Sequence, residues 1–140
     1  MTGLILAAGA SSRLGEAKQL LVYQGQSLLE RSIRLAFSVC KEVQVCLGAE
    51  VDQSIRIIEN LQKEFSTLSF VQVEHWDKGM GESLAVGLKT IDFSKDVLVL
   101  LCDLPFLTSS HIKNLTSLAN PERAIVASFQ GVNSSLRVKP

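Results

Sequence analysis

The sequence predicts one α/β domain, a three-layer Rossmann-like sandwich built around a mostly parallel sheet. Two observations lead to this fold class. Short apolar runs alternate with amphipathic segments along the chain, and a strand–helix–strand repeat of this kind favours parallel strands joined by right-handed crossovers. Several runs are continuous Val, Ile and Leu rather than alternating, which is typical of strands that helices cover on both faces.

Each run that is short enough for a strand is followed by a segment with helical spacing. The predicted strands are Gly3–Ala7, Val43–Leu47, Leu68–Glu74, Val97–Cys102 and Ala124–Ser128. The first helix opens at Ser27, because Ser27 and Glu30 have the spacing of a capping box. Later helices are predicted over Glu50–Phe65, Gly81–Ile91 and Ser109–Leu118.

Composition limits the classes of function. The chain has 140 residues, of which 46% are hydrophobic and 20% are charged, and its formal net charge is zero. A neutral domain argues against a nucleic-acid partner, and no apolar run approaches the roughly 20 residues of a membrane span. The sequence shows no leader segment, so we expect a cytoplasmic protein. We expect its three cysteines, Cys40, Cys46 and Cys102, to be buried reduced thiols.

The segment from Leu4 to Lys18 carries the strongest functional signal. An apolar run stops at a loop of Ala, Gly and Ser, whose small side chains let a ligand approach the backbone closely. Arg13 and Lys18 add positive charge where phosphate oxygens would lie. The glycines have neither P-loop nor dinucleotide-fingerprint spacing. The segment predicts a triphosphate site after the first strand; the alternative is a glycine-rich turn with two solvated cations.

Asp103 directly follows the apolar run of residues 97–102, at the carboxyl end of a predicted buried strand. Ligands of open parallel sheets bind beyond that end of the strands. Because Mg²⁺ favours one or two carboxylates together with phosphate oxygens and water, we expect Asp103 to be a ligand of this metal. The alternative is an aspartate that only caps the next helix.

A second glycine-containing loop, residues 75–83, lies between the third predicted strand and a helix. Gly79 and Gly81 permit a tight turn, and the amides at the helix start together with the Ser83 hydroxyl can bind a base or a sugar. The alternative is a loop that only starts a helix. His75 and His111 lack the spacing of metal ligands and are interpreted as surface or capping residues.

Three motifs occur in the order of a known family, over nearly all of residues 2–131. They are L-A-A-G-x-S-x-R-x-G-x-x-K at residues 6–18, G-M-G-x-S-L-x-x-G-L at 79–88 and C-D-x-P at 102–105. Together they resemble the nucleotidyltransferases of the molybdenum cofactor, which implies a nucleotide-diphospho-sugar transferase-like fold. The L-A-A-G form and the second motif resemble the cytidylyltransferase branch, since relatives that use guanosine tend to have L-A-G-G.

The resemblance implies a role for each motif residue. Such enzymes join a nucleoside monophosphate to a pterin phosphate with Mg²⁺ and release pyrophosphate. The implied partners are CTP, or another nucleoside triphosphate, and a molybdopterin-type acceptor. Arg13, Lys18 and Asp103 are expected to be the catalytic set, with Asp103 as the metal ligand. The expected nucleotide-binding residues are Ala7, Ala8, Gly9, Ser11, Ser12, Arg13, Lys18, Gly79, Gly81 and Ser83.

The last residues depart from the family pattern. Relatives continue well beyond a glycine-rich turn like that at residues 129–131, and that region normally supplies part of the acceptor site. We therefore expect an incomplete nucleotidyltransferase domain over residues 1–131 and an atypical tail over 132–140. With the usual C-terminal part lacking, we expect transfer activity to be weak or absent.

Two other functions fit the same motifs. A non-catalytic nucleotide-binding remnant would bind a nucleotide without turnover. A sugar- or polyol-phosphate nucleotidyltransferase would carry out the same reaction on another phosphate. A receiver-like domain does not fit, because it needs an acidic cluster after the first strand, where this chain has Ala7, Ala8 and Gly9.

Overall fold

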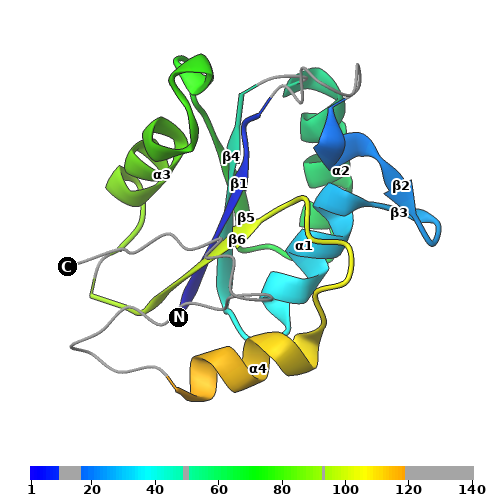
Figure 1. The fold of residues 1–140 in the computed structure, drawn as a ribbon, viewed down its shortest axis with the longest axis vertical. Helices are drawn as coiled ribbons and strands as arrows, with labels where there is room; N and C mark the ends of the chain where they lie inside the picture. Colours follow the sequence, from blue (N-terminus) through cyan, green and yellow to red (C-terminus); the bar gives the residue numbers. More distant parts are fainter. Residues whose placement is uncertain (10–16, 49–50, 93, 119–140) are drawn as a thin grey trace, which may run out of the picture. The chain divides into compact units, whose positions relative to one another are not determined.

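The computed structural model describes residues 1–9, 17–48, 51–92 and 94–118 (Figure 1). Residues 1–106 form one compact unit, and the residues from 107 onward belong to a second unit. The predicted strand at 124–128 and the predicted domain boundary at 131 lie outside the described residues. Among the described helices, none is both long enough and apolar enough to cross a membrane.

A four-stranded parallel sheet forms the centre of the first unit, in the order β5-β4-β1-β6. Its strands are β1 (Thr2–Ala7), β4 (Glu42–Leu47), β5 (Leu68–Gln72) and β6 (Val97–Leu101). The first four predicted strands are therefore confirmed, with β5 and β6 each ending slightly earlier than predicted.

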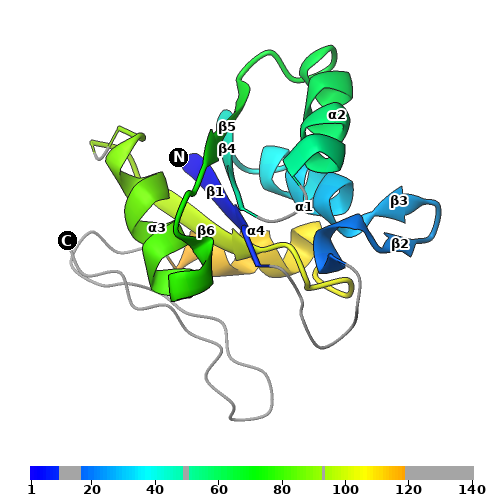
Figure 2. The same ribbon diagram turned by 90° about the horizontal axis from the view of Figure 1, so that it is seen from above.

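Helices cover both faces of this sheet, which confirms the predicted three-layer arrangement. Helices α1 (Leu28–Phe37) and α2 (Val51–Gln62) pack on one face, and α3 (Met80–Lys89) packs on the other (Figures 1 and 2). In the second unit, α4 (Ser109–Ser117) begins with a capping box between Thr108 and His111. The imidazole Nδ1 of His111 accepts a hydrogen bond from the Thr108 amide at 3.2 Å, which confirms His111 as a capping residue.

The order of the strands reverses at β1. From β1 the chain moves outward through β4 to β5, and it then returns through α3 to β6 on the opposite side of β1. Crossovers on opposite faces diverge at such a point, and in open α/β sheets a ligand binds there, beyond the carboxyl ends of the strands. The fold therefore predicts a ligand site at the segments that follow β1 and β6.

Burial of the central strand and of one helix face holds the unit together. All six residues of β1 are buried, as its continuous apolar sequence predicts. Helix α1 begins where the Ser27 hydroxyl accepts a hydrogen bond from the Glu30 amide at 3.1 Å. Its apolar stripe, which includes Leu29 and Ile33, is buried against the sheet. Each fully buried Leu or Ile side chain stabilises the fold by about 1.5–3 kcal/mol.

A short antiparallel hairpin between Lys18 and α1 was not predicted. The 3-10 helix η1 (Lys18–Leu20) leads into β2 (Val22–Tyr23), which pairs with β3 (Gln26–Ser27). Gln24 and Gly25 form the two-residue turn, with φ values of 50° and 80°. Two successive residues with positive φ are typical of a type I′ hairpin turn, so the Gln-Gly pair was the available signal.

We expect Gly87→Ala to destabilise the protein, although alanine favours helices. A Cβ atom at Gly87 would lie 2.6 Å from the Cys46 sulfur and 2.8 Å from a Leu4 methyl carbon, so α3 would have to move away from the sheet. We expect the free energy of unfolding in urea to fall by about 1–3 kcal/mol.

Gly81→Ala is the matched control on the same helix, because a Cβ there would meet no atom within 4 Å. Its stability should stay unchanged or rise by up to about 1 kcal/mol. Equal losses for the two variants would contradict the close packing of α3.

Candidate functional site

The loops after β1 and β6 leave the sheet side by side. Leu6 pairs with Leu101 in the ladder, and the Cys102 amide donates to the Leu6 carbonyl at 3.4 Å. Ala7 and Ala8 are buried and Gly9 is exposed, so the chain reaches the surface at the end of this first motif. Because parallel strands end at the same edge, Gly9 and Asp103 begin loops at one side of the sheet.

Lys18 and Asp103 meet at this edge, although they lie 85 residues apart in the chain. The Lys18 ammonium donates to the Asp103 carboxylate, with Nζ and Oδ2 3.4 Å apart. The two side chains are 42% and 39% exposed, so both groups are open to solvent and to a ligand. Gln19, which follows Lys18 in η1, is almost fully buried and anchors this segment to the unit.

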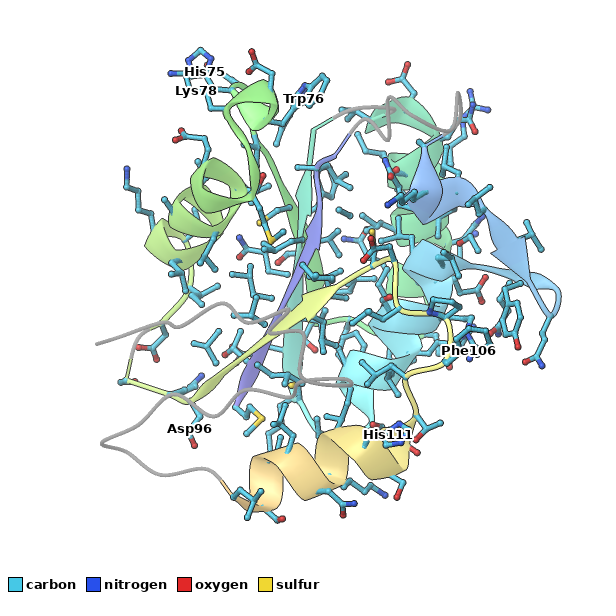
Figure 3. All side chains as sticks on the ribbon, viewed as in Figure 1. His75, Trp76, Lys78, Asp96, Phe106 and His111 are labelled. Atoms are coloured by element: carbon cyan, nitrogen blue, oxygen red, sulfur yellow. The ribbon has the colours of Figure 1, made fainter. Side chains whose placement is uncertain are left out.

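The loop of the second motif approaches the first motif closely because a glycine, Gly48, lies between them. Gly48 follows β4, and a Cβ built on it would lie 2.5 Å from both the Ala8 carbonyl oxygen and the Trp76 Cβ. Trp76 begins the 3-10 helix η2 (Trp76–Lys78), which ends at Gly79. Sequence reasoning did not single out Gly48; its position directly after a buried strand was the signal that could have found it. Figure 3 shows Trp76 and Lys78 at the tip of this loop.

The structure divides the second motif into an exposed part and a buried part. Gly79 has φ 105°, a conformation that favours glycine, and no side chain caps the start of α3 at this residue. Gly79 and Gly81 are exposed. Ser83 is only 3% exposed, and its carbonyl accepts from the Cys46 thiol at 3.4 Å. Ser83 thus packs α3 against β4, and its contact with a nucleoside stays a prediction.

Three residues of the expected site, Ser11, Ser12 and Arg13, lie outside the described residues, and their roles stay predictions. Of the others, the structure brings Lys18 and Asp103 into contact and places Ala8 close to the loop that carries Gly79 and Gly81. Gly79 and Gly81 present the uncapped amino end of a ten-residue helix, where the helix dipole favours an anion.

Among the described residues, the carboxylate arrangement suits a metal ion that arrives bound to a nucleotide rather than one held by the protein alone. Within residues 1–9, 17–48, 51–92 and 94–118, no three His, Cys, Asp or Glu side chains gather into a metal cluster. Asp103 is an exposed carboxylate at the edge where phosphates would lie. One carboxylate, phosphate oxygens and water form a usual set of ligands for Mg²⁺. Asp103 therefore fits such an ion, with most of its coordination supplied from outside the described chain.

Cys102 is adjacent to Asp103, but its thiol is not an available nucleophile. Burial raises its pKa from the ordinary 9.0 to about 12, and the negative charge of Asp103 adds to the shift. Burial also raises the pKa of Cys40 and of Cys46 to about 11. All three cysteines are free and buried, which confirms the expectation from sequence.

Comparison with known proteins identifies a family and supports the fold. The fold and site define a doubly wound α/β domain whose polar residues gather at the switch point of the sheet. Residues 3–135 match the family model of the MobA-like NTP transferase domain. The chain therefore belongs to this family, and the resemblance to molybdenum-cofactor nucleotidyltransferases is confirmed at the level of the family.

The curated relatives carry more than one function. The chain is 32% identical over 136 residues to nicotine blue oxidoreductase of Paenarthrobacter nicotinovorans, covering 96% of this chain and 64% of that protein. It is 38% identical over 104 residues to a probable molybdenum cofactor guanylyltransferase of Synechococcus elongatus, covering 74% of this chain and 50% of that protein. The chain thus spans between half and two thirds of the length of these relatives.

Solved structures share the fold. A homolog of Rv0371c from Mycobacterium sp. strain JC1 superposes with a TM-score of 0.68 at 32% identity, covering 83% of this chain and 57% of that one. A 4-diphosphocytidyl-2C-methyl-D-erythritol synthase from Anaerococcus prevotii superposes with a TM-score of 0.67 at 17% identity, covering 87% of this chain and 51% of that one. The second likeness supports the fold alone.

We expect the native protein to resist thiol reagents. With pKa values of about 11 and 12, the three buried cysteines hold almost no reactive thiolate near neutral pH. Ellman's reagent at pH 8 should label them slowly in the native state and rapidly in urea. A thiol that reacts at once in the native protein would show that a cysteine is exposed.

The same shifts predict a loss of stability in alkali. The folded state holds thiol protons more tightly than the unfolded state, so the contribution is complete below pH 9 and is lost as the pH rises to about 11 and 12. Urea unfolding between pH 8 and 11 should show this fall, and Cys46→Ala should show a shallower one. Equal slopes for both proteins would contradict the burial of Cys46 as a thiol.

Proposed function

We propose that this domain binds a nucleoside triphosphate at the carboxyl edge of its sheet and transfers the nucleotidyl group to a phosphorylated acceptor. The observation that carries this proposal is the exposed pair of Lys18 and Asp103, 3.4 Å apart at the switch point between β1 and β6. Membership of the MobA-like NTP transferase domain family supports the same reaction class.

The ion pair of Lys18 and Asp103 contributes little to folding, but both of its charges can bind a nucleotide. An exposed ion pair of this kind contributes about 0–1 kcal/mol to folding, because both groups stay well solvated. A metal–triphosphate complex offers each group a stronger partner: phosphate oxygens for Lys18 and the divalent cation for Asp103. Lys18 and Asp103 can therefore exchange their contact with each other for contacts with the nucleotide and its metal.

The reaction needs positioning and charge neutralisation rather than a protein nucleophile. An oxygen of the acceptor phosphate attacks the α-phosphorus, the bond from that phosphorus to the bridging oxygen breaks, and pyrophosphate leaves with the electron pair. Lys18, and Arg13 as implied by the motif, would stabilise the charge on the leaving group. Mg²⁺ held by Asp103 would supply Lewis-acid polarisation of the phosphate.

For the particular substrates we propose CTP and a molybdopterin-type acceptor. The L-A-A-G form of the first motif and the G-M-G-x-S-L form of the second support cytidine. The relatives named as probable molybdenum cofactor guanylyltransferases support the acceptor class, but their names indicate guanosine as the base. Binding of CTP therefore has to be compared directly with binding of GTP.

A redox function is the second candidate, because a relative named nicotine blue oxidoreductase matches 96% of this chain at 32% identity. Such a function would need an electron carrier. Binding of NADPH or FMN, without binding of any nucleoside triphosphate, would favour it over nucleotidyl transfer.

The test is calorimetric titration with CTP, GTP, ATP, NADPH and FMN, with and without Mg²⁺. We expect CTP to bind best and in a metal-dependent manner. Asp103→Asn should weaken this binding by at least about tenfold, because it removes the charge that the metal requires. Turnover with an added acceptor then separates an active transferase from a domain that only binds.

Glu42→Gln is the matched control. Glu42 is also an exposed carboxylate paired with a lysine, Lys95, at 3.1 Å, but it lies at the amino end of β4. This variant should bind nucleotides as the unaltered protein does. Equal weakening by both substitutions, or no nucleotide binding by the unaltered chain, would contradict the proposed site.

A further inference from the structure

Four residues from three segments contact one another close in sequence to Lys18 and Asp103: Tyr23 in β2, Arg31 in α1, and Pro105 and Phe106 after β6. We call this group the Arg31 brace. The Arg31 guanidinium donates from Nη2 to the Pro105 carbonyl at 3.0 Å and lies over the Tyr23 ring, 5.2 Å from its centroid. Tyr23 in turn meets the Phe106 ring edge to face, with centroids 5.8 Å apart.

The contacts of Arg31 restrain the turn that carries Asp103. Pro105 follows Asp103 by two residues, so a hydrogen bond to its carbonyl ties this turn directly to α1. The planar guanidinium suits this double task, since it donates in its plane and stacks on an aromatic ring through its face. Lysine can supply the donor but has no planar group to lie over the ring.

The aromatic contact joins the other half of the site. Tyr23 follows Lys18 by five residues and Phe106 follows Asp103 by three, so their rings bridge the two segments that carry the charges. Phe106 is labelled in Figure 3. It is 75% exposed, so burial alone does not account for its position. The aromatic pair and the cation over it supply the attraction that holds these segments together.

We propose that Arg31 is a positioning residue that, through the Arg31 brace, holds Asp103 opposite Lys18. The expected effect of Arg31 on metal-dependent nucleotide binding rests on the proposed function. The expected effect of Arg31 on the turn after Asp103 does not, because the turn is held before any ligand binds. The two effects can therefore be measured separately.

The variants are Arg31→Met, Arg31→Lys and a matched control, Arg34→Met, on the same helix. Arg34 is ion-paired with Glu30 and Glu64, and like Arg31 it lies over an aromatic ring, 5.7 Å from the centroid of Phe65. Arg34 thus shares with Arg31 a guanidinium over an aromatic ring, without a contact to the turn after β6 among the contacts that the structure describes. Loss of stability common to both methionine variants then cancels in the comparison.

The first readout needs no ligand. The chain contains one tyrosine, so fluorotyrosine labelling gives a single ¹⁹F resonance, that of Tyr23. Arg31→Met should shift this resonance and speed hydrogen exchange at the amides of Leu104 and Phe106. Arg34→Met should change neither. If Arg31→Met leaves both signals as in the unaltered protein, the brace does not hold the turn and the inference is overturned.

The second readout is the concentration of Mg²⁺ that half-saturates CTP binding. We expect Arg31→Met to raise it by about tenfold, as loss of residues that orient metal ligands commonly does. Arg31→Lys should recover part of this loss, and Arg34→Met should stay near the unaltered value. Unchanged metal dependence in Arg31→Met would also overturn the inference. Failure of the unaltered chain to bind nucleotides would instead refute the proposed function, and the first readout would still decide the role of Arg31.

Discussion

Hydrogen bonding along both edges of β1 is the constraint on which the rest of the structure depends. Leu6 pairs with Cys46 of β4 on one side and with Leu101 of β6 on the other. Side chains alternate between the two faces of a sheet, and helices cover both faces of β1: Gly3 lies against Ala36 of α1, and Leu4 lies against Gly87 of α3. A shift of one residue would move each of these residues to the opposite face. The same register fixes how far the first motif lies from Asp103, so core packing and site geometry are set together.

Close approach of backbone is the second condition. Gly48 leaves room for Ala8 and Trp76, and Gly87 leaves room for Cys46 and Leu4. Both positions are needed to bring the second motif to the edge where the first motif ends. The G-M-G-x-S-L-x-x-G-L pattern therefore combines two roles: its first glycines form the exposed loop, while Ser83 and Gly87, one helical turn apart, pack α3 on the sheet.

Two exposed ion pairs show that the place of a charged pair in the fold, rather than the pairing itself, makes it a candidate binding site. The pair of Lys18 and Asp103 and the pair of Lys95 and Glu42 are both exposed lysine–carboxylate contacts of similar length. Neither contributes much to folding, since water solvates such groups nearly as well when they are apart. The difference lies in the fold: the first pair is at the carboxyl ends of β1 and β6, where an open α/β sheet presents its loops and helix amino ends to a ligand. Arg31 belongs with this pair, since it donates to the Pro105 carbonyl in the turn after Asp103.

The sequence by itself determined the fold class, four strands of the parallel sheet and the helices between them, and it singled out Lys18 and Asp103 as candidate site residues. It did so because continuous apolar runs, capping residues and glycine loops are local signals with a direct physical meaning. Only the tertiary structure decided that Lys18 contacts Asp103, that Gly48 admits Trp76, that Ser83 is buried and that Arg31 reaches the Pro105 carbonyl. Each of these depends on segments far apart in the chain, whose distance is set by strand order and helix packing, and no local pattern encodes that distance.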